Sequence, residues 1–351
     1  MPATMQIHDI ALDIRRSIEN AETKIKVALL GRSGAGKSSL INALVGAPIA
    51  EIDIKTNTTT RAEFYEWNNL ILVDLPGFDT ESFPQATFFD DFDLGQFDIY
   101  LCVFAEKINN AEATLFKRVL SSSKPSILVR SKWDCAKQKG FTKDELAARV
   151  RVDIVSQLQT SLGVYFVSVD PEEGLNNLQF AISGKLEGVK GALWIKQAKA
   201  YSQAFLDQKK TECEKTVTLY AGLSAATALV PIPGAGVAVD LAALVRLFDL
   251  LRKSFGIQKV EPREIGIPVL QQAASRIINY ATTEGAVLLL KRFATSETVK
   301  EVSKYVPFVG QVVAASLGFA ITRAAGRAYL NDCYSLAQAE LDKLVNLGYS
   351  P

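Results

Sequence analysis

The stretch Gly31-Arg32-Ser33-Gly34-Ala35-Gly36-Lys37-Ser38 decides how the rest of the chain is expected to fold. It follows a short apolar run and precedes apolar residues at helical spacing, the strand–loop–helix context that a phosphate-binding loop requires. Glycines let backbone N–H groups turn toward phosphate oxygens, and the start of the following helix adds a favourable dipole. Lys37 is expected to reach the β- and γ-phosphates, and the Ser38 hydroxyl to bind Mg²⁺. The predicted phosphate site comprises Gly31, Ser33, Gly34, Ala35, Gly36, Lys37, Ser38 and Ser39.

Short apolar runs alternate with helical segments through the first half of the chain. This alternation predicts an α/β domain with a mostly parallel sheet and helices on both of its faces. A capping box at Thr142 and Glu145 marks one helix start, and Asp170-Pro171 with Glu173 marks another. The predicted strands are Ile25–Leu30, Leu70–Val73, Ile99–Phe104, Ile127–Val129 and Val164–Val169.

Past residue 184 the strand signals stop, and the remainder reads as helices rich in Ala, Leu and Val. Thr216–Val239 and Tyr305–Thr322 carry no charge, but Pro and Gly interrupt both of them. We interpret both as buried helical hairpins rather than as membrane-spanning helices. An amphipathic helix over residues 5–20 has no strand partner and is expected to pack with these helices. The predicted domains are 1–23 with the helical domain, 24–184, and 185–351.

Asp74-Leu75-Pro76-Gly77 follows an apolar strand downstream of the phosphate loop. In that position Asp74 is expected to hold Mg²⁺ through water, and the Gly77 N–H to sense the γ-phosphate. Between the two motifs lies a threonine-rich segment, in which Thr59 or Thr60 would join Mg²⁺ only when γ-phosphate is present. An ordinary polar loop is the alternative for that segment. The predicted catalytic residues are Lys37, Thr59, Thr60 and Gly77, and the metal ligands are Ser38, Thr59, Thr60 and Asp74.

Ser131-Lys132-Trp133-Asp134 follows the strand that ends at Val129. A carboxylate at Asp134 can accept from guanine N1–H and the N2 amino group together, a paired contact that adenine does not offer. Lys132 would lie along the base. Ser131 stands where Asn is usual, which leaves one orienting hydrogen bond open. Ser168 either closes the base pocket or is simply a hydroxyl at a strand end. The motif favours GTP and GDP as ligands over a P-loop ATPase or kinase.

Composition excludes several classes of function. The net charge of +1 with no strongly basic segment argues against nucleic acid as a partner. The four cysteines are far apart and His8 is the single histidine, so zinc sites, disulfide frameworks and His-dependent triads are not expected. A reducing, cytoplasmic location fits this cysteine usage best.

Phe78 follows Gly77 at the position where Ras-type GTPases carry the Gln that orients the attacking water. An apolar side chain cannot do this. We therefore expect a GTPase that is slow as a monomer, or one completed by a group from a second molecule or another loop. A GTP-binding scaffold with negligible turnover is the alternative. Phe78 favours the scaffold, whereas the intact Lys37, Ser38 and Asp74 favour the enzyme.

With these motifs in place, the sequence resembles the immunity-related (interferon-inducible) GTPases, or a bacterial or early-branching relative of them. The resemblance covers nearly the whole chain. It implies a Ras-like G domain, a helical domain built from both chain ends, slow hydrolysis stimulated by G-domain dimerisation as in dynamin-like proteins, and action at intracellular membranes. It rests on Gly31–Ser39, Asp74–Gly77, Phe97-Asp98, Val230–Gly234 with Val239-Asp240, Ser254–Gly256 and Val306–Gly310.

The helical region offers one candidate membrane surface. Apolar residues between Val287 and Val306 interleave with Lys291, Arg292, Lys300 and Lys304. Basic residues beside exposed apolar ones suit an anionic lipid surface, so peripheral binding to intracellular membranes is one interpretation. The other is that the apolar residues fill the core of the helical domain while the basic ones face water.

Overall fold

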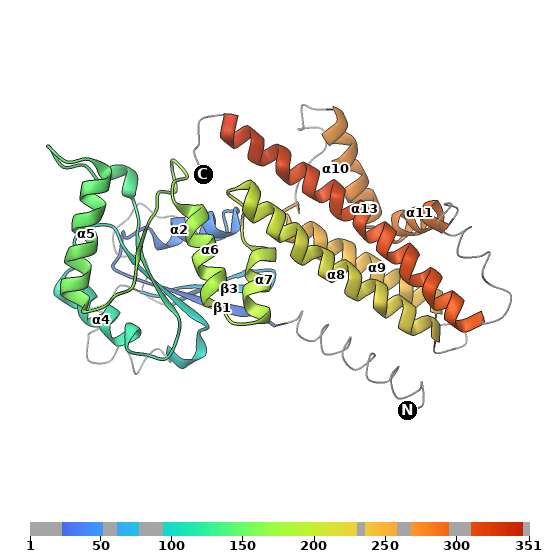
Figure 1. The fold of residues 1–351 in the computed structure, drawn as a ribbon, viewed down its shortest axis with the longest axis horizontal. Coiled ribbons are helices and arrows are strands. Elements are labelled where there is room, and N and C mark those ends of the chain that lie inside the picture. Colours follow the sequence, from blue (N-terminus) through green and yellow to red (C-terminus); the bar gives the residue numbers. More distant parts are fainter. Residues whose placement is uncertain are drawn as a thin grey trace. The chain divides into compact units, whose positions relative to one another are not determined.

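The computed structural model describes residues 23–51, 62–76, 94–229, 236–257, 268–294 and 310–346. These residues form two compact units, one over residues 23–205 and the other over residues 206–342. The first is an α/β unit and the second is helical, and Figure 1 labels elements of each unit. A P-loop G domain followed by a helical domain is therefore confirmed as the fold class.

The α/β unit is built on a six-stranded sheet in the order β2-β3-β1-β4-β5-β6. All neighbouring pairs are parallel except β2 and β3, which are antiparallel. Parallel strands need crossover helices, and those helices cover both faces of such a sheet. The strands are β1 (Ile25–Leu30), β2 (Glu63–Trp67), β3 (Leu70–Asp74), β4 (Ile99–Phe104), β5 (Ser126–Arg130) and β6 (Val164–Phe166).

Strand β2 was not predicted, and β6 is shorter than predicted. The sequence of β2, Glu-Phe-Tyr-Glu-Trp, lies on the sheet edge with no fully buried residue, so it lacks the continuous apolar run of the inner strands. Strand β6 ends at Phe166, and Ser168 instead forms an isolated antiparallel bridge with Glu173. The chain therefore leaves the sheet two residues before Ser168.

Helix ends in this unit agree in part with the predicted caps. Thr142 and Glu145 form the predicted capping box at the start of α5. The start predicted at Asp170-Pro171 is wrong, because α6 begins after Gly174, whose left-handed φ of 72° and close approach to the Phe166 carbonyl suit only glycine. The helices are α2 (Lys37–Val45), α4 (Asn110–Leu120), α5 (Lys143–Leu158), α6 (Leu175–Lys185) and α7 (Val189–Gln197), with short 3₁₀ turns η1 (Leu94–Gln96) and η2 (Trp133–Cys135).

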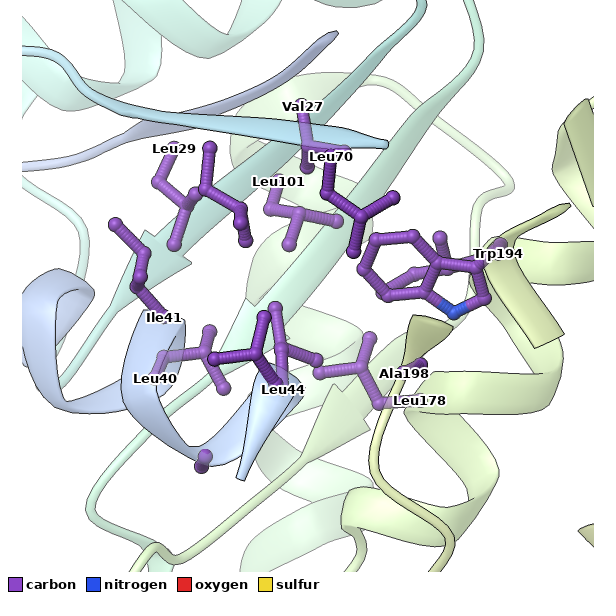
Figure 2. Close-up of a cluster of buried hydrophobic side chains, with 14 of the residues drawn as sticks. Val27, Leu29, Leu40, Ile41, Leu44, Leu70, Leu101, Leu178, Trp194 and Ala198 are labelled. Carbon is purple, nitrogen blue, oxygen red and sulfur yellow. The ribbon is translucent and has the colours of Figure 1, made fainter. Parts of the chain in front are cut away.

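Two apolar layers enclose the sheet. Alternate residues of β1 point to opposite faces: Val27 joins the core under α2, α6 and α7, whereas Ala28 joins the core under α4 and α5. Figure 2 shows the first layer, in which Trp194 of α7 lies beside Leu178 of α6. Because α7 packs into this core, the boundary between the units falls between Phe205 and Leu206 rather than near residue 184.

The helical unit has a core of its own, formed by residues of its five labelled helices. Gly326 allows close packing there, since a Cβ atom at this position would lie 2.7 Å from Val217 Cγ1. Thr322 also donates a hydrogen bond to Ser224 across 3.2 Å. The helices are α8 (Gln203–Leu229), α9 (Gly236–Ser254), α10 (Pro268–Tyr280), α11 (Thr283–Ala294) and α13 (Gly310–Asn346).

Several sequence predictions concern residues that the structure does not describe: the helix over 5–20, the breaks near Pro231 and Pro307, and the basic positions Lys300 and Lys304. Within the described ranges, none of the helices combines the length and apolarity needed to cross a membrane. Leu289 of α11 is buried in the helical core, whereas its neighbour Leu288 is 62% exposed.

Candidate nucleotide-binding site

The loop between β1 and α2 has the backbone of a phosphate cradle. A Cβ atom on Gly31 would lie 2.0 Å from the Val103 carbonyl oxygen, so only glycine fits at the start of the loop. Gly34 and Gly36 have φ angles of 78° and 83°, and no described residue has an atom within 4 Å of the position that a Cβ on Gly34 would take. The turn therefore leaves open space beside its exposed backbone, where an anion can approach.

The first N–H groups of α2 face this loop, and no side chain of the helix start occupies them. Its N-cap is Gly36, no side chain caps it, and its first turn holds no acidic residue. The first N–H groups of a helix have no acceptor within the helix, and they carry a partial positive charge. The loop and the helix start are thus arranged to receive phosphate oxygens. Ser33 and Gly34 are exposed, and Ser39 is half-buried in α2.

Lys37 lies beneath the loop and is 5% exposed. Its Nζ donates to the carbonyl oxygens of Gly31 at 2.9 Å and Arg32 at 3.3 Å, and it lies 3.5 Å from Asp74 Oδ1. An ammonium group in this position can transfer its hydrogen bonds from the loop carbonyls to phosphate oxygens. This position is compatible with the predicted contact between Lys37 and the β- and γ-phosphate oxygens.

The Asp74 carboxylate, at the C-terminal end of β3, lies beside the Ser38 hydroxyl of α2. The Ser38 hydroxyl donates to Asp74 Oδ2 at 2.8 Å. Among the described residues Asp74 Oδ1 is buried and accepts no hydrogen bond, although the Lys37 charge is near. Burial raises the pKa of the Asp74 carboxyl, while Lys37 and Ser38 act in the opposite direction. A hydroxyl beside an under-coordinated carboxylate fits Mg²⁺, which prefers oxygen ligands.

The other predicted ligands of this end, Thr59, Thr60 and Gly77, lie outside the described residues. Across the ranges that the structure describes, no group of three or more His, Cys, Asp and Glu side chains could hold a metal ion. A metal at Ser38 and Asp74 would therefore depend on oxygens from elsewhere, such as phosphates.

Asp134, Lys132 and Ser168 meet at the other end of the site, beyond β5 and β6. Ser168 is fully buried, and its Oγ accepts from the Asp134 N–H at 2.8 Å. Lys132 is exposed with a left-handed φ of 51°, and its Cε lies 3.8 Å from the Cβ position of Gly36. The structure therefore brings the base motif next to the phosphate loop. Ser168 therefore holds the backbone of Asp134 in place. Neither of the two roles predicted for Ser168 included this contact.

The structure shows which hydrogen bond Ser131 makes in the position where Asn is usual. Its hydroxyl donates to the Ala35 carbonyl oxygen at 2.6 Å and lies 3.2 Å from that of Phe104. Ser131 is buried, so this bond fixes the phosphate loop to the start of the base motif in a site closed to water. Serine thus supplies an orienting hydrogen bond between the two motifs.

Cys135 was not singled out from the sequence, although it follows Asp134 directly. Its exposed thiol donates to Asp134 Oδ2 at 3.0 Å. This bond is the largest contribution that lowers the pKa of Asp134, and the same bond, followed by the charge of Asp134, raises the pKa of the Cys135 thiol. The carboxylate proposed to bind guanine is therefore ionised at neutral pH.

The chain is similar to known proteins in both sequence and structure. The chain is 24% identical to "Interferon-inducible GTPase 5" of Bos taurus over 351 residues, covering 90% of this chain and 74% of the relative. It is 26% identical to "T-cell-specific guanine nucleotide triphosphate-binding protein 2" of Mus musculus, covering 70% of this chain and 63% of that one. "Probable GTP-binding protein EngB" of Malacoplasma penetrans is 44% identical over 57 residues, which is 16% of this chain and 31% of that protein.

Among solved structures, an Era variant of Aquifex aeolicus bound to GDP and AlF4⁻ matches 57% of this chain and 68% of its own, with 20% identity and a TM-score of 0.38. The model of the family described as Interferon-inducible GTPase (IIGP) matches residues 4–278. Because that match covers most of the sequence, the chain belongs to the interferon-inducible GTPase family and is a GTPase.

Proposed function

We propose that this GTPase is a magnesium-dependent switch whose hydrolysis is slow in the monomer and is stimulated when two nucleotide-binding units associate. The magnesium site rests on one observation: Lys37, Ser38 and Asp74 lie together beneath an open glycine loop, and one Asp74 oxygen accepts no hydrogen bond from any described residue. When bound, Mg²⁺ would neutralise phosphate charge there, held by Ser38 and Asp74. Lys37 would bind the β- and γ-phosphate oxygens.

The dimer-stimulated hydrolysis rests on Phe78, which follows the Asp-x-x-Gly motif and cannot orient water. A polar or charged group from a second copy is the simplest replacement, comparable to an arginine finger supplied in trans. In this proposal Thr59 or Thr60 and the Gly77 N–H respond to the γ-phosphate, while Asp134 selects guanine.

The test is the rate of GTP hydrolysis per molecule across a hundredfold range of protein concentration. The proposal expects specific activity to rise with concentration and to depend on Mg²⁺. A specific activity that stays flat would reject dimer-stimulated hydrolysis. Single-turnover measurements at the highest concentration separate the enzyme from a scaffold with negligible turnover, because a scaffold would leave bound GTP intact.

A weaker observation supports peripheral membrane contact by the helical unit, which would place the protein in the cytoplasm at intracellular membranes. Leu288 is 62% exposed on α11, and the basic residue Arg292, also exposed, follows one turn later. Exposed apolar and basic residues together favour an anionic lipid surface. Co-flotation with phosphatidylserine vesicles in the GTP and GDP states tests this, with Leu288→Glu as the variant expected to lose binding. Absence of flotation in both states would reject it.

A further inference from the structure

Arg32, the second residue of the phosphate loop, makes contacts that its place in the motif does not explain. Its guanidinium Nη2 lies 2.5 Å from Glu106 Oε2, and its Nε lies 4.0 Å from Glu112 Oε1. Glu106 follows β4 and is 75% exposed, whereas Glu112 lies in the first turn of α4 and is 4% exposed. One side chain thus joins the phosphate loop to the segment that leads from the sheet into α4.

Glu112 is a buried carboxylate with an incomplete set of partners. Its Oε2 accepts from the Asn109 N–H at 3.2 Å as half of the capping box of α4. Its Oε1 is buried and makes no hydrogen bond to any described residue. A buried carboxylate is costly unless a cation compensates it, and the ion pair recorded for Glu112 is with Arg32. Arg32 is therefore placed to balance this charge.

The backbone of Arg32 acts on the nucleotide site directly. Its carbonyl oxygen accepts from Lys37 Nζ at 3.3 Å and from the Ala35 N–H at 3.2 Å. The side chain is thus held by α4 while the carbonyl holds the lysine that faces phosphate. Any shift of the Arg32 backbone would move an acceptor of Lys37.

We infer that Arg32 is a positioning residue for the phosphates of GTP: anchored on Glu112, it fixes the loop carbonyl that orients Lys37. Glu106 adds an exposed contact that solvent screens, so it contributes less. This inference rests on the proposed role of Lys37 in binding phosphate.

The experiment measures the dissociation constant of mant-GTP, together with KM and kcat, for wild type and for Arg32→Ala, Arg32→Lys, Glu112→Gln and Arg32→Ala/Glu112→Gln. We expect Arg32→Ala to weaken GTP binding and raise KM about tenfold, with kcat changed less, and Arg32→Lys to retain most of the affinity. Glu112→Gln alone should also weaken GTP binding, and adding it to Arg32→Ala should change the affinity by no more than about twofold, because both substitutions remove the same anchor.

Two controls separate positioning from general stability. Glu106→Gln should change affinity by no more than about twofold, since its ion pair is exposed. Arg276→Ala removes a comparable ion pair, with Asp332 at 2.5 Å in the helical unit, and should lower Tm while leaving GTP affinity unchanged. Lys37→Ala distinguishes the two proposals: if it leaves GTP affinity unchanged, the proposed phosphate site is wrong.

If Lys37→Ala weakens binding but a folded Arg32→Ala does not, the role of Arg32 alone is rejected. A Glu112→Gln variant with wild-type affinity, or a double variant that binds GTP about tenfold more weakly than Arg32→Ala, would reject Glu112 as the anchor, because the two residues would then act independently. Thermal melts identify variants that fail to fold, and Arg32→Lys carries the test if Arg32→Ala does not fold. A folded Arg32→Lys that binds GTP about tenfold more weakly than wild type would overturn the inference, because a retained cation should hold the anchor.

Discussion

The two ends of the nucleotide site are built in different ways. At the phosphate end, Lys37 and Asp74 are 5% and 1% exposed and are held by the loop carbonyls and by Ser38. At the base end, Lys132 is exposed and Asp134 is half-buried, with Ser168 as its buried support. The phosphate end is thus organised by the fold itself, whereas the base end presents side chains that guanine would have to order. Mutations at the two ends should therefore have different effects on stability and on GTP affinity.

The largest effect is expected at the phosphate end from Gly31→Ala. The new Cβ would lie 2.0 Å from the Val103 carbonyl oxygen, so β1 and β4 would have to separate. We expect a loss of about 3 kcal/mol in the free energy of unfolding and loss of GTP binding. Urea denaturation and mant-GTP titration measure both.

Gly34→Ala is the matched control for this variant. No described residue has an atom within 4 Å of its Cβ position, so the cost is confined to its left-handed φ of 78°, about 1 kcal/mol. Equal stability of the two alanine variants would contradict the close approach described at Gly31.

The next effect is that of Lys37→Ala. The substitution removes the buried cation beside Asp74 and the charge that faces phosphate. GTP affinity should fall at least about tenfold, equivalent to about 1.4 kcal/mol. Lys132→Ala, at the exposed end, should cost less. A larger loss for Lys132→Ala in the same titration would reverse the comparison between the two ends.

Asp134→Asn tests the base end. An amide in place of the carboxylate cannot accept from both guanine N1–H and the N2 amino group, so GTP affinity should fall about tenfold or more and preference should move toward xanthosine triphosphate. Competition titrations with GTP, XTP and ATP measure this change. Wild-type protein that binds ATP as tightly as GTP would show that Asp134 does not select the base.

Ser131→Ala tests whether Ser131 supports phosphate binding or base selection. By sequence it opens the base motif, but its hydroxyl bonds to the Ala35 carbonyl of the phosphate loop. Loss of one buried hydrogen bond should cost about 1 kcal/mol, or about fivefold in affinity. The loss should be equal for GTP and XTP. A changed ratio between the two nucleotides would assign Ser131 to base selection instead.

The smallest effect concerns Cys135. The hydrogen bond to Asp134 and the charge of its carboxylate raise the pKa of the exposed Cys135 thiol, which favours the protonated form at pH 7. Asp134→Asn removes that charge, lowers the pKa of the thiol and should accelerate alkylation by iodoacetamide about threefold. Mass spectrometry of the labelled peptide measures the rate, with buried Cys102 as the internal slow control. Identical rates in both proteins would show that the Asp134–Cys135 contact does not form in solution.

The inner strands were predictable because their residues are apolar on both faces of the sheet. The loop at Gly31 was predictable because its glycine, lysine and serine pattern after a strand is rarely found outside phosphate-binding loops. Edge strand β2 was not, since its exposed residues carry no burial signal. The boundary near residue 184 was placed too early because α7 resembles the later helices in composition, yet Trp194 packs into the core of the sheet unit. Composition reports that a helix is apolar but not which core it fills.

By itself, the sequence determined the α/β class, the order of the nucleotide motifs and the residue types in each motif. The backbone at Gly31 accepts only glycine, and few side chains other than lysine, serine and aspartate can make the contacts that these motifs require. Only the tertiary structure decided which side chains meet. Ser131 reaches Ala35 and Arg32 pairs with Glu112, contacts between residues 96 and 80 positions apart that no local pattern encodes. They exist because parallel strands bring their carboxyl ends to one edge of the sheet, and that convergence is a property of the assembled fold.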